Sequence, residues 1–90
     1  MNSLEPTTAI LVIDDEESLR NTFQFFLQNQ GYGPVITAAT FDQAIEEIHA
    51  RAFDLIISDI VLGGHTGIDV LKQVREKGLS CPVVMITGYP

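Results

Sequence analysis

Four short apolar runs limit what this chain can fold into. They lie at 9–13, 35–38, 55–58 and 83–86, are rich in β-branched residues and lack polar alternation. Runs of this kind are typical of strands covered on both faces, as in a parallel sheet. With 90 residues, of which 46% are hydrophobic, the chain is long enough for one domain and too apolar for a disordered tail.

Three helical patterns separate the four runs. Their apolar stripes are Leu19, Phe23, Phe26 and Leu27, then Phe41, Ala44, Ile45 and Ile48, and finally Ile68, Leu71 and Val74. Phe25 lies off the first stripe and is a possible contact surface. Each stripe can pack on a sheet. The order β-α-β-α-β-α-β predicts an α/β fold with a doubly wound parallel sheet, in which right-handed crossovers connect the strands. We expect a lead over residues 1–8 and one domain over 9–90.

Capping residues mark the ends of the predicted helices. Suitable N-terminal residues are Asp15 for the first helix, Thr40 with Gln43 as a capping box for the second, and Thr66 with Asp69 as a looser version for the third. Gly31 and Gly78 lie where a left-handed residue would end the first and third helices.

The charge of the chain is strongly acidic. It has 5 Lys and Arg against 12 Asp and Glu, a net charge of −7, which argues against nucleic acid and anionic membranes and favours a cation or a basic partner. Cys81 is the only cysteine, so no disulfide forms within the chain. Residues 1–8 do not have the pattern of a signal peptide, and no apolar stretch is long enough to cross a membrane. We therefore expect a cytoplasmic protein.

Acidic side chains follow two of the predicted strands. Asp14 and Asp15 come after the first strand, Asp59 ends the third, and Thr87 ends the fourth. Ligands bind beyond the carboxyl ends of strands in open α/β sheets, and the first and third strands are neighbours if the strand order reverses there. Two carboxylates about 4 Å apart repel by ~4 kcal/mol at an effective dielectric constant near 20, so either a proton or a cation must lie between them.

Oxygen ligands without His or Cys favour Mg²⁺ at such a site. A purely structural interpretation remains open, in which the two adjacent aspartates start a helix and the third acid ends a strand.

Four blocks of the sequence resemble the receiver domain of two-component response regulators. They are residues 10–17 (ILVIDDEE), 54–60 (DLIISDI), 63–71 (GGHTGIDVL) and 83–90 (VVMITGYP), which together span most of the chain. The resemblance implies a flavodoxin-like fold with five strands and five helices, here truncated after the fourth strand. It also implies an N-terminal receiver whose output domain lies beyond Pro90, with a role in transcription regulation.

The resemblance also assigns roles to individual residues. Asp59 is similar to the aspartate that takes a phosphoryl group from a histidine kinase. Asp15 resembles a direct Mg²⁺ ligand, and Asp14 one that acts mainly through a bound water. The backbone carbonyl of Val61 would be a further metal ligand, and Thr87 resembles the switch hydroxyl that moves to bond the phosphoryl group. The amides of Ile60, Val61 and Gly88 would be additional donors.

One family feature has no counterpart in this sequence. The lysine at the end of the family's fifth strand is absent, and Lys72 and Lys77 fall on the third helical pattern. We therefore expect the 90-residue chain by itself to be phosphorylated inefficiently. Without the last helix-strand-helix, a strand edge and apolar faces would be uncovered, so we also expect self-association.

Two alternatives remain at this point. A haloacid-dehalogenase-type aspartyl phosphohydrolase also uses Mg²⁺ and a strand-end aspartate, but it would need a second acid where this chain has Val61. A degenerate receiver would serve only in dimerisation and would not respond to Mg²⁺. We favour the phosphoacceptor, a signalling module that assists only its own phosphorylation and dephosphorylation and is not an enzyme.

The loop after Asp59 contains glycines and a histidine. Gly63, Gly64 and Gly67 do not have the spacing of a dinucleotide-binding motif and predict a tight loop with positive φ. We interpret His65 as a solvated loop histidine.

Overall fold

A four-stranded parallel sheet is the centre of the protein. The structure is a computed structural model and describes residues 8–86. The strand order is β2-β1-β3-β6, and a short two-stranded sheet pairs β4 with β5. The strands are β1 (Ile10–Ile13), β2 (Val35–Ala38), β3 (Leu55–Asp59), β4 (Val61–Leu62), β5 (His65–Thr66) and β6 (Val83–Ile86). The helices are α1 (Glu17–Asn29), α2 (Phe41–Ala50) and α3 (Gly67–Glu76).

The predicted topology is confirmed. β1 pairs in parallel with both β2 and β3, and β3 pairs in parallel with β6. The strand order therefore reverses at β1, so that the chain crosses from β2 over β1 to β3. All four residues of β1 are buried, which explains why this run is continuously apolar.

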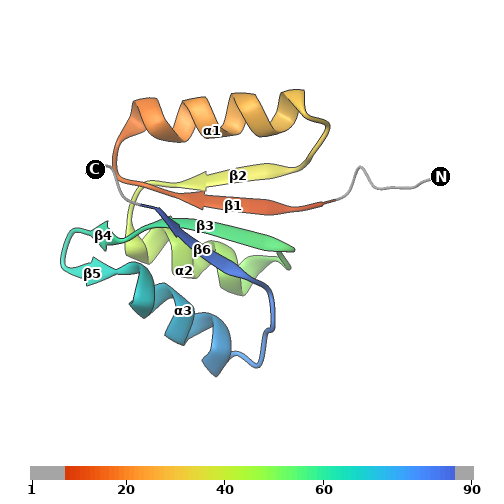
Figure 1. Ribbon diagram of the computed structural model, residues 1–90. Helices are drawn as coiled ribbons and strands as arrows, with labels where there is room; N and C mark the ends of the chain where they lie inside the picture. Colours follow the sequence, from red (N-terminus) through yellow and green to blue (C-terminus); the bar gives the residue numbers. More distant parts are fainter. Residues whose placement is uncertain (1–7, 87–90) are drawn as a thin grey trace.

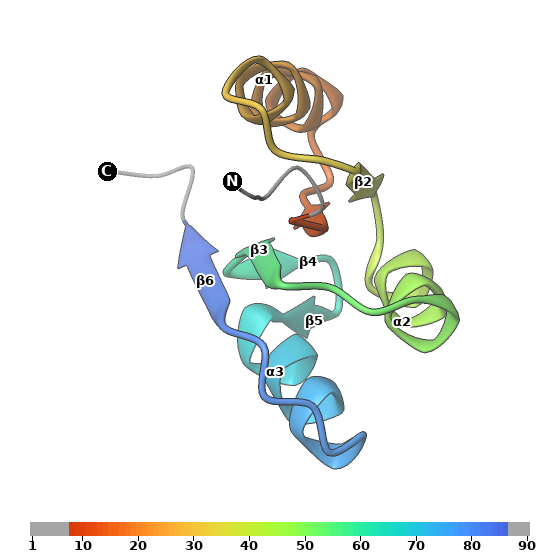
Figure 2. The same ribbon diagram turned by 90° about the vertical axis from the view of Figure 1, so that its right-hand side faces the viewer.

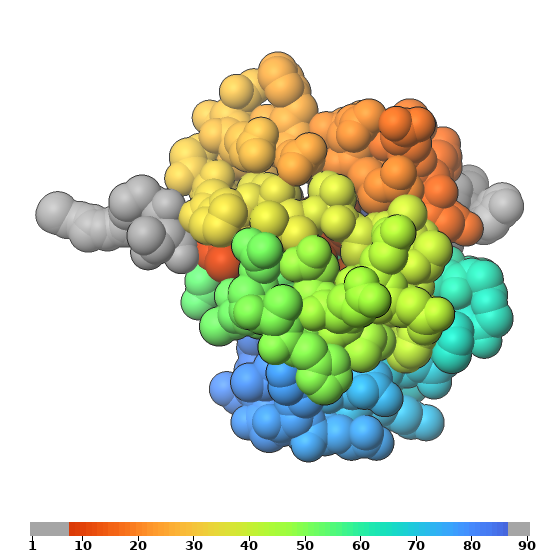
Figure 3. Space-filling model, turned by 180° about the vertical axis from the view of Figure 1, so that it is seen from behind, coloured from red at the N-terminus to blue at the C-terminus, as the bar shows by residue number. Residues whose placement is uncertain are grey.

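Helices cover both faces of the sheet. α1 lies on one side, and α2 and α3 lie on the other (Figures 1 and 2). The arrangement is the doubly wound α/β fold expected from the alternation of strands and helices. Seen from behind, the yellow and green surfaces leave only small areas of the red start of the described chain visible, in agreement with the burial of β1 (Figure 3).

The face under α2 and α3 carries the larger core. Its buried residues come from the strands, from both helices and from the loops between them: Leu11, Ile13, Ala38, Ala44, Ile48, Phe53, Ile56, Leu62, Val70 and Val74. The predicted stripe of α2 is confirmed, because Ala44 and Ile48 are buried while Phe41 and Ile45 pack against the same cluster.

The face under α1 is less completely covered. Its buried residues all come from strands: Ile10, Val12, Val35 and Ile57. Phe23 and Leu27 of α1 pack against them, but no residue of α1 is itself buried. The predicted stripe was wrong at Phe26, which is exposed, whereas Phe25 lies off the stripe as expected and is 68% exposed.

The predicted stripe of α3 was wrong at Ile68 and is confirmed at Val74. Ile68 is exposed, and the buried residues of the helix are Gly67, Val70 and Val74. The helix begins at Gly67, whose missing side chain lets the first turn approach β3 and β6 closely. This approach fixes the rotation of the helix, and it turns Val70 rather than Ile68 toward the sheet.

Most helix ends follow the sequence signals, and the capping box predicted at α2 is only half formed. The side chain of Thr66 accepts from the amide of Asp69, and the Asp69 side chain accepts from the amide of Thr66, so this capping box is complete. At α2, Thr40 Oγ1 accepts from the Gln43 amide, but the Gln43 side chain accepts from the amide of Ala39. Gly31 and Gly78 have φ of 93° and 78°, as their C-terminal positions predicted.

The start of α1 also differs from the prediction. The N-cap residue is Glu16, without a side-chain capping bond, and not the predicted Asp15. The amide of Glu16 instead donates to Asp14 Oδ1 at 2.9 Å. Asp14, the buried acid after β1, therefore accepts from an otherwise free amide at the start of α1. The Asp15 side chain does not cap the helix.

Candidate metal and phosphoryl site

Three carboxylates meet at the carboxyl edge of the sheet. Parallel pairing places Ile13 opposite Ser58, so the residues that follow them, Asp14 and Asp59, lie at neighbouring strand ends. Asp14, Asp15 and Asp59 each offer an oxygen, and these oxygens all lie within 4.8 Å of one another. The predicted convergence of the acids is therefore present in the fold.

Asp14 is a buried acid with like charges around it. It is 2% exposed. Burial raises the pKa of its carboxyl group, and the charges of Asp59, Asp15 and Glu16 raise the pKa further, against the lowering effect of the hydrogen bond from the Glu16 amide. The site therefore concentrates negative charge where the protein itself provides little compensation.

Asp59 is the last residue of β3 and is half-buried. Its Oδ1 accepts a long hydrogen bond of 3.4 Å from the amide of Val61, and its carbonyl accepts from the hydroxyl of Ser58 at 2.9 Å. Ser58 is fully buried in the strand. The backbone of Asp59 is thus fixed by the sheet, while its carboxylate is only weakly held and faces the other two acids.

The segment after Asp59 folds back as a small hairpin that the sequence pattern did not predict. β4 and β5 pair antiparallel, with Val61 opposite Thr66. The amide of Ile60 donates to the carbonyl of Ile86 in β6 at 2.8 Å, and the carbonyl of Ile60 accepts from the Gly67 amide at 2.8 Å. The expectation that the Ile60 amide is free to bind a phosphoryl group was therefore wrong, because this donor is part of the sheet.

Gly67 approaches the backbone of Asp59 closely. A Cβ atom at this position would lie 3.1 Å from the Asp59 carbonyl oxygen and 3.1 Å from the Met85 side chain. Only Gly63 of the three loop glycines has positive φ, at 62°. The prediction of a tight loop is confirmed at Gly63, but Gly67 is needed for close packing rather than for its backbone angle.

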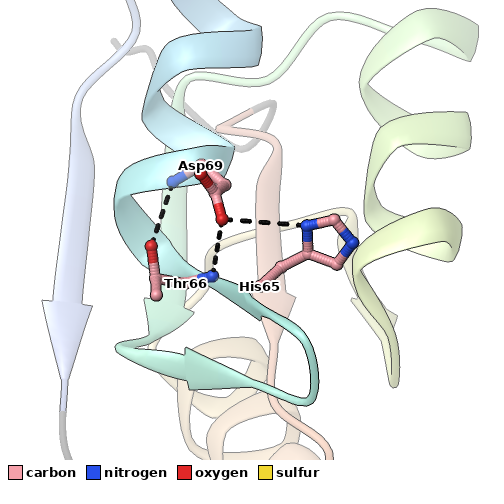
Figure 4. Close-up of polar contacts among 3 residues, drawn as sticks. All are labelled: His65, Thr66 and Asp69. Atoms are coloured by element: carbon pink, nitrogen blue, oxygen red, sulfur yellow. Dashed lines mark hydrogen bonds and ion pairs between the residues drawn. The ribbon is translucent and has the colours of Figure 1, made fainter.

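His65 makes more contacts than a solvated loop residue. Its ring stacks on Phe41 of α2, with centroids 3.9 Å apart and the planes 9° from parallel. Its Nδ1 lies 3.7 Å from Asp69 Oδ2, the oxygen that also accepts from the Thr66 amide (Figure 4). The ring is solvated as interpreted, because it is about half exposed, but His65 belongs to β5 and its ring also ties the β4–β5 hairpin to α2.

A shallow hollow of about 220 Å³ lies beside the acidic cluster. Its wall combines Asp15, the start of α2 and the β4–β5 hairpin, and the lining residues are Asp15, Ala39, Thr40, Phe41, Asp42, Leu62, Gly63 and His65. Because Asp15 lines it, one of the three acids is open to solvent and can be reached from this side.

Arg20 is a residue near the site that the sequence patterns did not single out. Its Nη1 donates to the backbone carbonyl of Asp14 at 2.8 Å. The signal that could have revealed it is simple, because Arg20 is the only Lys or Arg in the first 50 residues and follows the acidic pair within six residues.

The predicted site residues are thus only partly described by the structure. Asp14, Asp15 and Asp59 come together, and Val61 lies two residues beyond Asp59 at the start of the hairpin. Thr87 and Gly88 lie outside the described residues.

The donor chemistry of the cluster fits a hard divalent cation. The group consists of three carboxylates, and neither histidine nor the cysteine belongs to it within residues 8–86. A buried acid with a raised pKa next to two further acids is the environment in which a bound Mg²⁺ would relieve repulsion.

The family comparison decides the assignment of the fold. The profile of the response regulator receiver domain matches residues 10–90. The chain belongs to this family. The family resemblance of the sequence is thus confirmed, and so is its α/β class with a parallel central sheet.

Relatives of this receiver domain regulate transcription. It is 41% identical over 79 residues to the alkaline phosphatase synthesis transcriptional regulatory protein PhoP of Bacillus subtilis, covering 88% of this chain and 32% of the relative. It is 38% identical over 79 residues to the transcriptional regulatory protein DltR of Streptococcus agalactiae, covering 88% of this chain and 35% of the relative. The chain spans about a third of the length of these two relatives.

Solved structures of response regulators share the fold. The response regulator TrrA of Thermotoga maritima, in complex with Mg²⁺-BeF, is 31% identical with a TM-score of 0.83, and the match covers 92% of this chain and 71% of that one. The chemotaxis response regulator CheY4 of Vibrio cholerae is 33% identical with a TM-score of 0.82, covering 88% and 67%. Among the described residues of the receiver domain, no helix has the length and apolar character needed to cross a bilayer.

Proposed function

We propose that this receiver domain accepts a phosphoryl group from a histidine kinase on Asp59 and thereby switches a downstream output. The observation that carries the proposal is the meeting of the Asp14, Asp15 and Asp59 oxygens within 4.8 Å at the carboxyl edge of the sheet. Membership of the receiver family supports the same role for the cluster.

The chain supplies ligands for Mg²⁺ from three segments. Carboxylates of Asp15 and Asp59 and the backbone carbonyl of Val61 would hold the ion, with Asp14 acting mainly through a bound water. When bound, Mg²⁺ neutralises charge on the phosphoryl oxygens and orients the donor for in-line transfer. The related protein TrrA was solved in complex with Mg²⁺-BeF, which supports Mg²⁺ as the ion.

The transfer itself needs a nucleophile and a movable hydroxyl. A carboxylate oxygen of Asp59 forms the new bond to phosphorus while the bond from phosphorus to the donor imidazole nitrogen breaks. The electron pair of that bond stays on the imidazole nitrogen. The phosphoaspartate brings added charge and strong acceptor oxygens, to which the Val61 amide and the Thr87 hydroxyl would donate. Movement of Thr87 would shift the balance between inactive and active surfaces.

Phosphorylation by acetyl phosphate tests this proposal. We expect intact-mass spectrometry to show an adduct of about 80 Da, one phosphoryl group, that requires Mg²⁺ and is lost in Asp59→Asn. Asp42→Asn is the matched control, because Asp42 lies in the first turn of α2 and outside the acidic cluster. An adduct that persists in Asp59→Asn, or one that forms equally well in EDTA, would contradict the role of Asp59.

The two alternatives give different results with the same protein. A haloacid-dehalogenase-type hydrolase would release phosphate from a generic phosphomonoester with repeated turnover. A degenerate receiver used only for dimerisation would show no rise in melting temperature in millimolar Mg²⁺, whereas an ion that binds only the folded state stabilises it by RT ln(1 + [L]/Kd).

Self-association through the sheet edge is part of the proposal. Within residues 8–86, β6 pairs with β3 on one side only, and Val84 of β6 is 47% exposed. Phe25 and Phe26 of α1 are exposed as well. Sedimentation velocity should show concentration-dependent dimers that Val84→Lys weakens, because a charge on an edge strand opposes pairing. A monomer at all concentrations would contradict this part.

The whole protein would be a transcriptional response regulator. We propose that residues 9–90 are receiver sequence preceded by a short lead over 1–8, and that an output domain follows Pro90. A net charge of −7 supports a receiver that does not itself bind DNA. A mobility-shift assay with this chain should give no complex, and a shift in physiological salt would contradict the division of roles.

A further inference from the structure

The turn between β1 and α1 sets the positions of two of the three acids. The amide of Asp14 donates to the carbonyl of Ala38 in β2 at 3.1 Å, and Asp14 Oδ1 accepts from the Glu16 amide. The carboxylate of Asp15 is exposed and has no hydrogen bond or ion pair to any residue in the described part of the chain. Its position therefore depends on the backbone of the turn.

Arg20 closes this turn from within α1. Its guanidinium donates to the Asp14 carbonyl at 2.8 Å, and its own amide donates to the carbonyl of Glu16 at 3.1 Å. The two bonds reach both ends of the segment from Asp14 to Glu16. The guanidinium binds a carbonyl rather than a carboxylate, so it holds the backbone without occupying an oxygen that a cation needs.

The other basic residues are placed differently. Arg51 pairs with Glu47 at the end of α2. Arg75 donates to the carbonyl of Leu79 after α3, and Lys77 donates to the carbonyl of Ile48 in α2. Arg20 is thus the basic residue of α1 and the one that contacts the acidic edge among the described residues.

We propose that Arg20 is a positioning residue for the divalent cation site. By fixing the Asp14 carbonyl, it holds the Asp15 carboxylate toward Asp59 before the ion binds. The inference rests on the proposed function, since it assumes that the three acids bind Mg²⁺. Arginine suits the task because its guanidinium stays charged and presents several donors in a rigid plane.

Two effects of Arg20 on Mg²⁺ affinity oppose each other. Its positive charge disfavours a nearby cation, whereas the fixed turn favours binding because the ligands need no reordering. Groups that orient metal ligands typically change affinity by about 10- to 100-fold when they are removed. We therefore expect the positioning effect to exceed the charge effect, with a net loss near the lower end of that range.

Mg²⁺ titrations followed by NMR or calorimetry test this inference. Arg20→Gln should raise the Mg²⁺ dissociation constant by about tenfold, the lower value for loss of an orienting group. Arg51→Gln is the matched control, because it removes the same charge from an exposed pair on α2 and should leave the constant unchanged. Arg20→Lys keeps the charge and a donor, and it should restore most of the affinity.

A spectroscopic measurement separates positioning from general destabilisation. In metal-free protein, the side-chain carboxyl carbon resonance of Asp15 should shift or broaden in Arg20→Gln and not in Arg51→Gln. If Arg20→Gln fails to fold, Arg20→Lys carries the test, with an expected loss of affinity that is measurable but smaller than the about tenfold loss on removing such a group.

The outcomes distinguish this inference from the proposed function. Wild-type protein that binds no Mg²⁺ would overturn both. Wild-type protein that binds Mg²⁺, together with a folded Arg20→Gln variant that binds as tightly as Arg51→Gln, would overturn the positioning role alone.

Discussion

The two faces of the sheet are built from similar strands but are covered to different degrees. On the face of α2 and α3, both helices contribute fully buried side chains to a cluster of ten residues. On the face of α1, the four buried residues belong to strands, and α1 contributes only partly buried side chains. The same β1 residues alternate between the two environments, with Leu11 on one face and Val12 on the other.

This difference means that one face contributes most of the stability of the domain, while the other carries exposed side chains that are available for contact. Buried side chains contribute most of the hydrophobic free energy, so the face under α2 and α3 should contribute more to the free energy of folding than the face under α1. The exposed phenylalanines of α1 can be changed with little loss of stability. The acidic cluster lies at the edge where the two faces meet, and its shape depends on the turn before α1 and on the hairpin before α3.

The largest expected effect comes from the better-covered face. Ile48→Ala should lower the free energy of unfolding by about 3 kcal/mol, because it leaves a cavity among tightly packed neighbours. Ile48 is 2% exposed and packs in the cluster of α2 and α3. Urea denaturation in the absence of Mg²⁺ measures the change.

Leu27→Ala is the matched control on the other face. Leu27 packs against the strand cluster but is only partly buried, so about 1 kcal/mol is expected for its truncation. Equal losses in the two variants would show that α1 is covered in solution as completely as α2, and they would remove the contrast between the faces.

The next prediction concerns the contact between α3 and β3. Gly67→Ala should destabilise the domain by about 2 kcal/mol, because the added methyl group would press on the Asp59 carbonyl and on Met85. It should also weaken Mg²⁺ binding, since Asp59 would have to move. Thermal melting and Mg²⁺ titration measure the two effects.

Gly64→Ala provides the comparison for the same chemical change. A Cβ atom at Gly64 meets nothing within 4 Å, and its φ is not positive. We expect no loss of stability or Mg²⁺ affinity. A loss similar to that of Gly67→Ala would mean that the hairpin, rather than the close approach to Asp59, is the sensitive element.

The sequence predicted the sheet better than the helix faces. Continuous apolar runs gave the carboxyl end of three of the four strands at the correct residue, and β3 ends one residue after its run, at Asp59. Helical stripes failed at Phe26 and Ile68, because which face a helix presents depends on how its first turn packs. For α3 that packing is set by Gly67, whose close contact has no signature in hydrophobic spacing.

The acids of the site were predictable because strand ends in a parallel sheet share one edge. The contacts that support them were not. Arg20 bonds a backbone carbonyl, that of Asp14, and His65 stacks its ring face on Phe41. Contacts of these two kinds cannot be predicted from the residue types at the two positions. The β4–β5 hairpin was missed because two-residue strands are too short to show a period.

The third prediction concerns Asp14, at the carboxyl edge of the sheet. Asp14→Asn should stabilise the metal-free protein at neutral pH by about 1 kcal/mol, because it removes a buried charge among like charges and keeps an acceptor for the Glu16 amide. It should also reduce the stabilisation by Mg²⁺. Urea denaturation in EDTA and in Mg²⁺ measures both.

The pH dependence of this effect has a defined sign. Folding raises the pKa of Asp14 above its unfolded value, so the folded state favours the protonated acid. The unfavourable contribution is absent below about pH 3.9, the ordinary pKa of Asp, and grows until the pH passes the folded pKa. The advantage of Asp14→Asn should therefore vanish in acid. An advantage that persists there would point to packing rather than charge.

The smallest effect on stability is expected at the most exposed aromatic residue of α1. Phe25→Ser should change the free energy of unfolding by no more than about 0.5 kcal/mol, since the side chain is 68% exposed. The same change should weaken self-association if the α1 face is where copies meet. Sedimentation velocity and urea denaturation on the same sample separate the two readouts. Gln24→Ser is the control, because Gln24 bonds the carbonyl of Val35 and should alter stability rather than association.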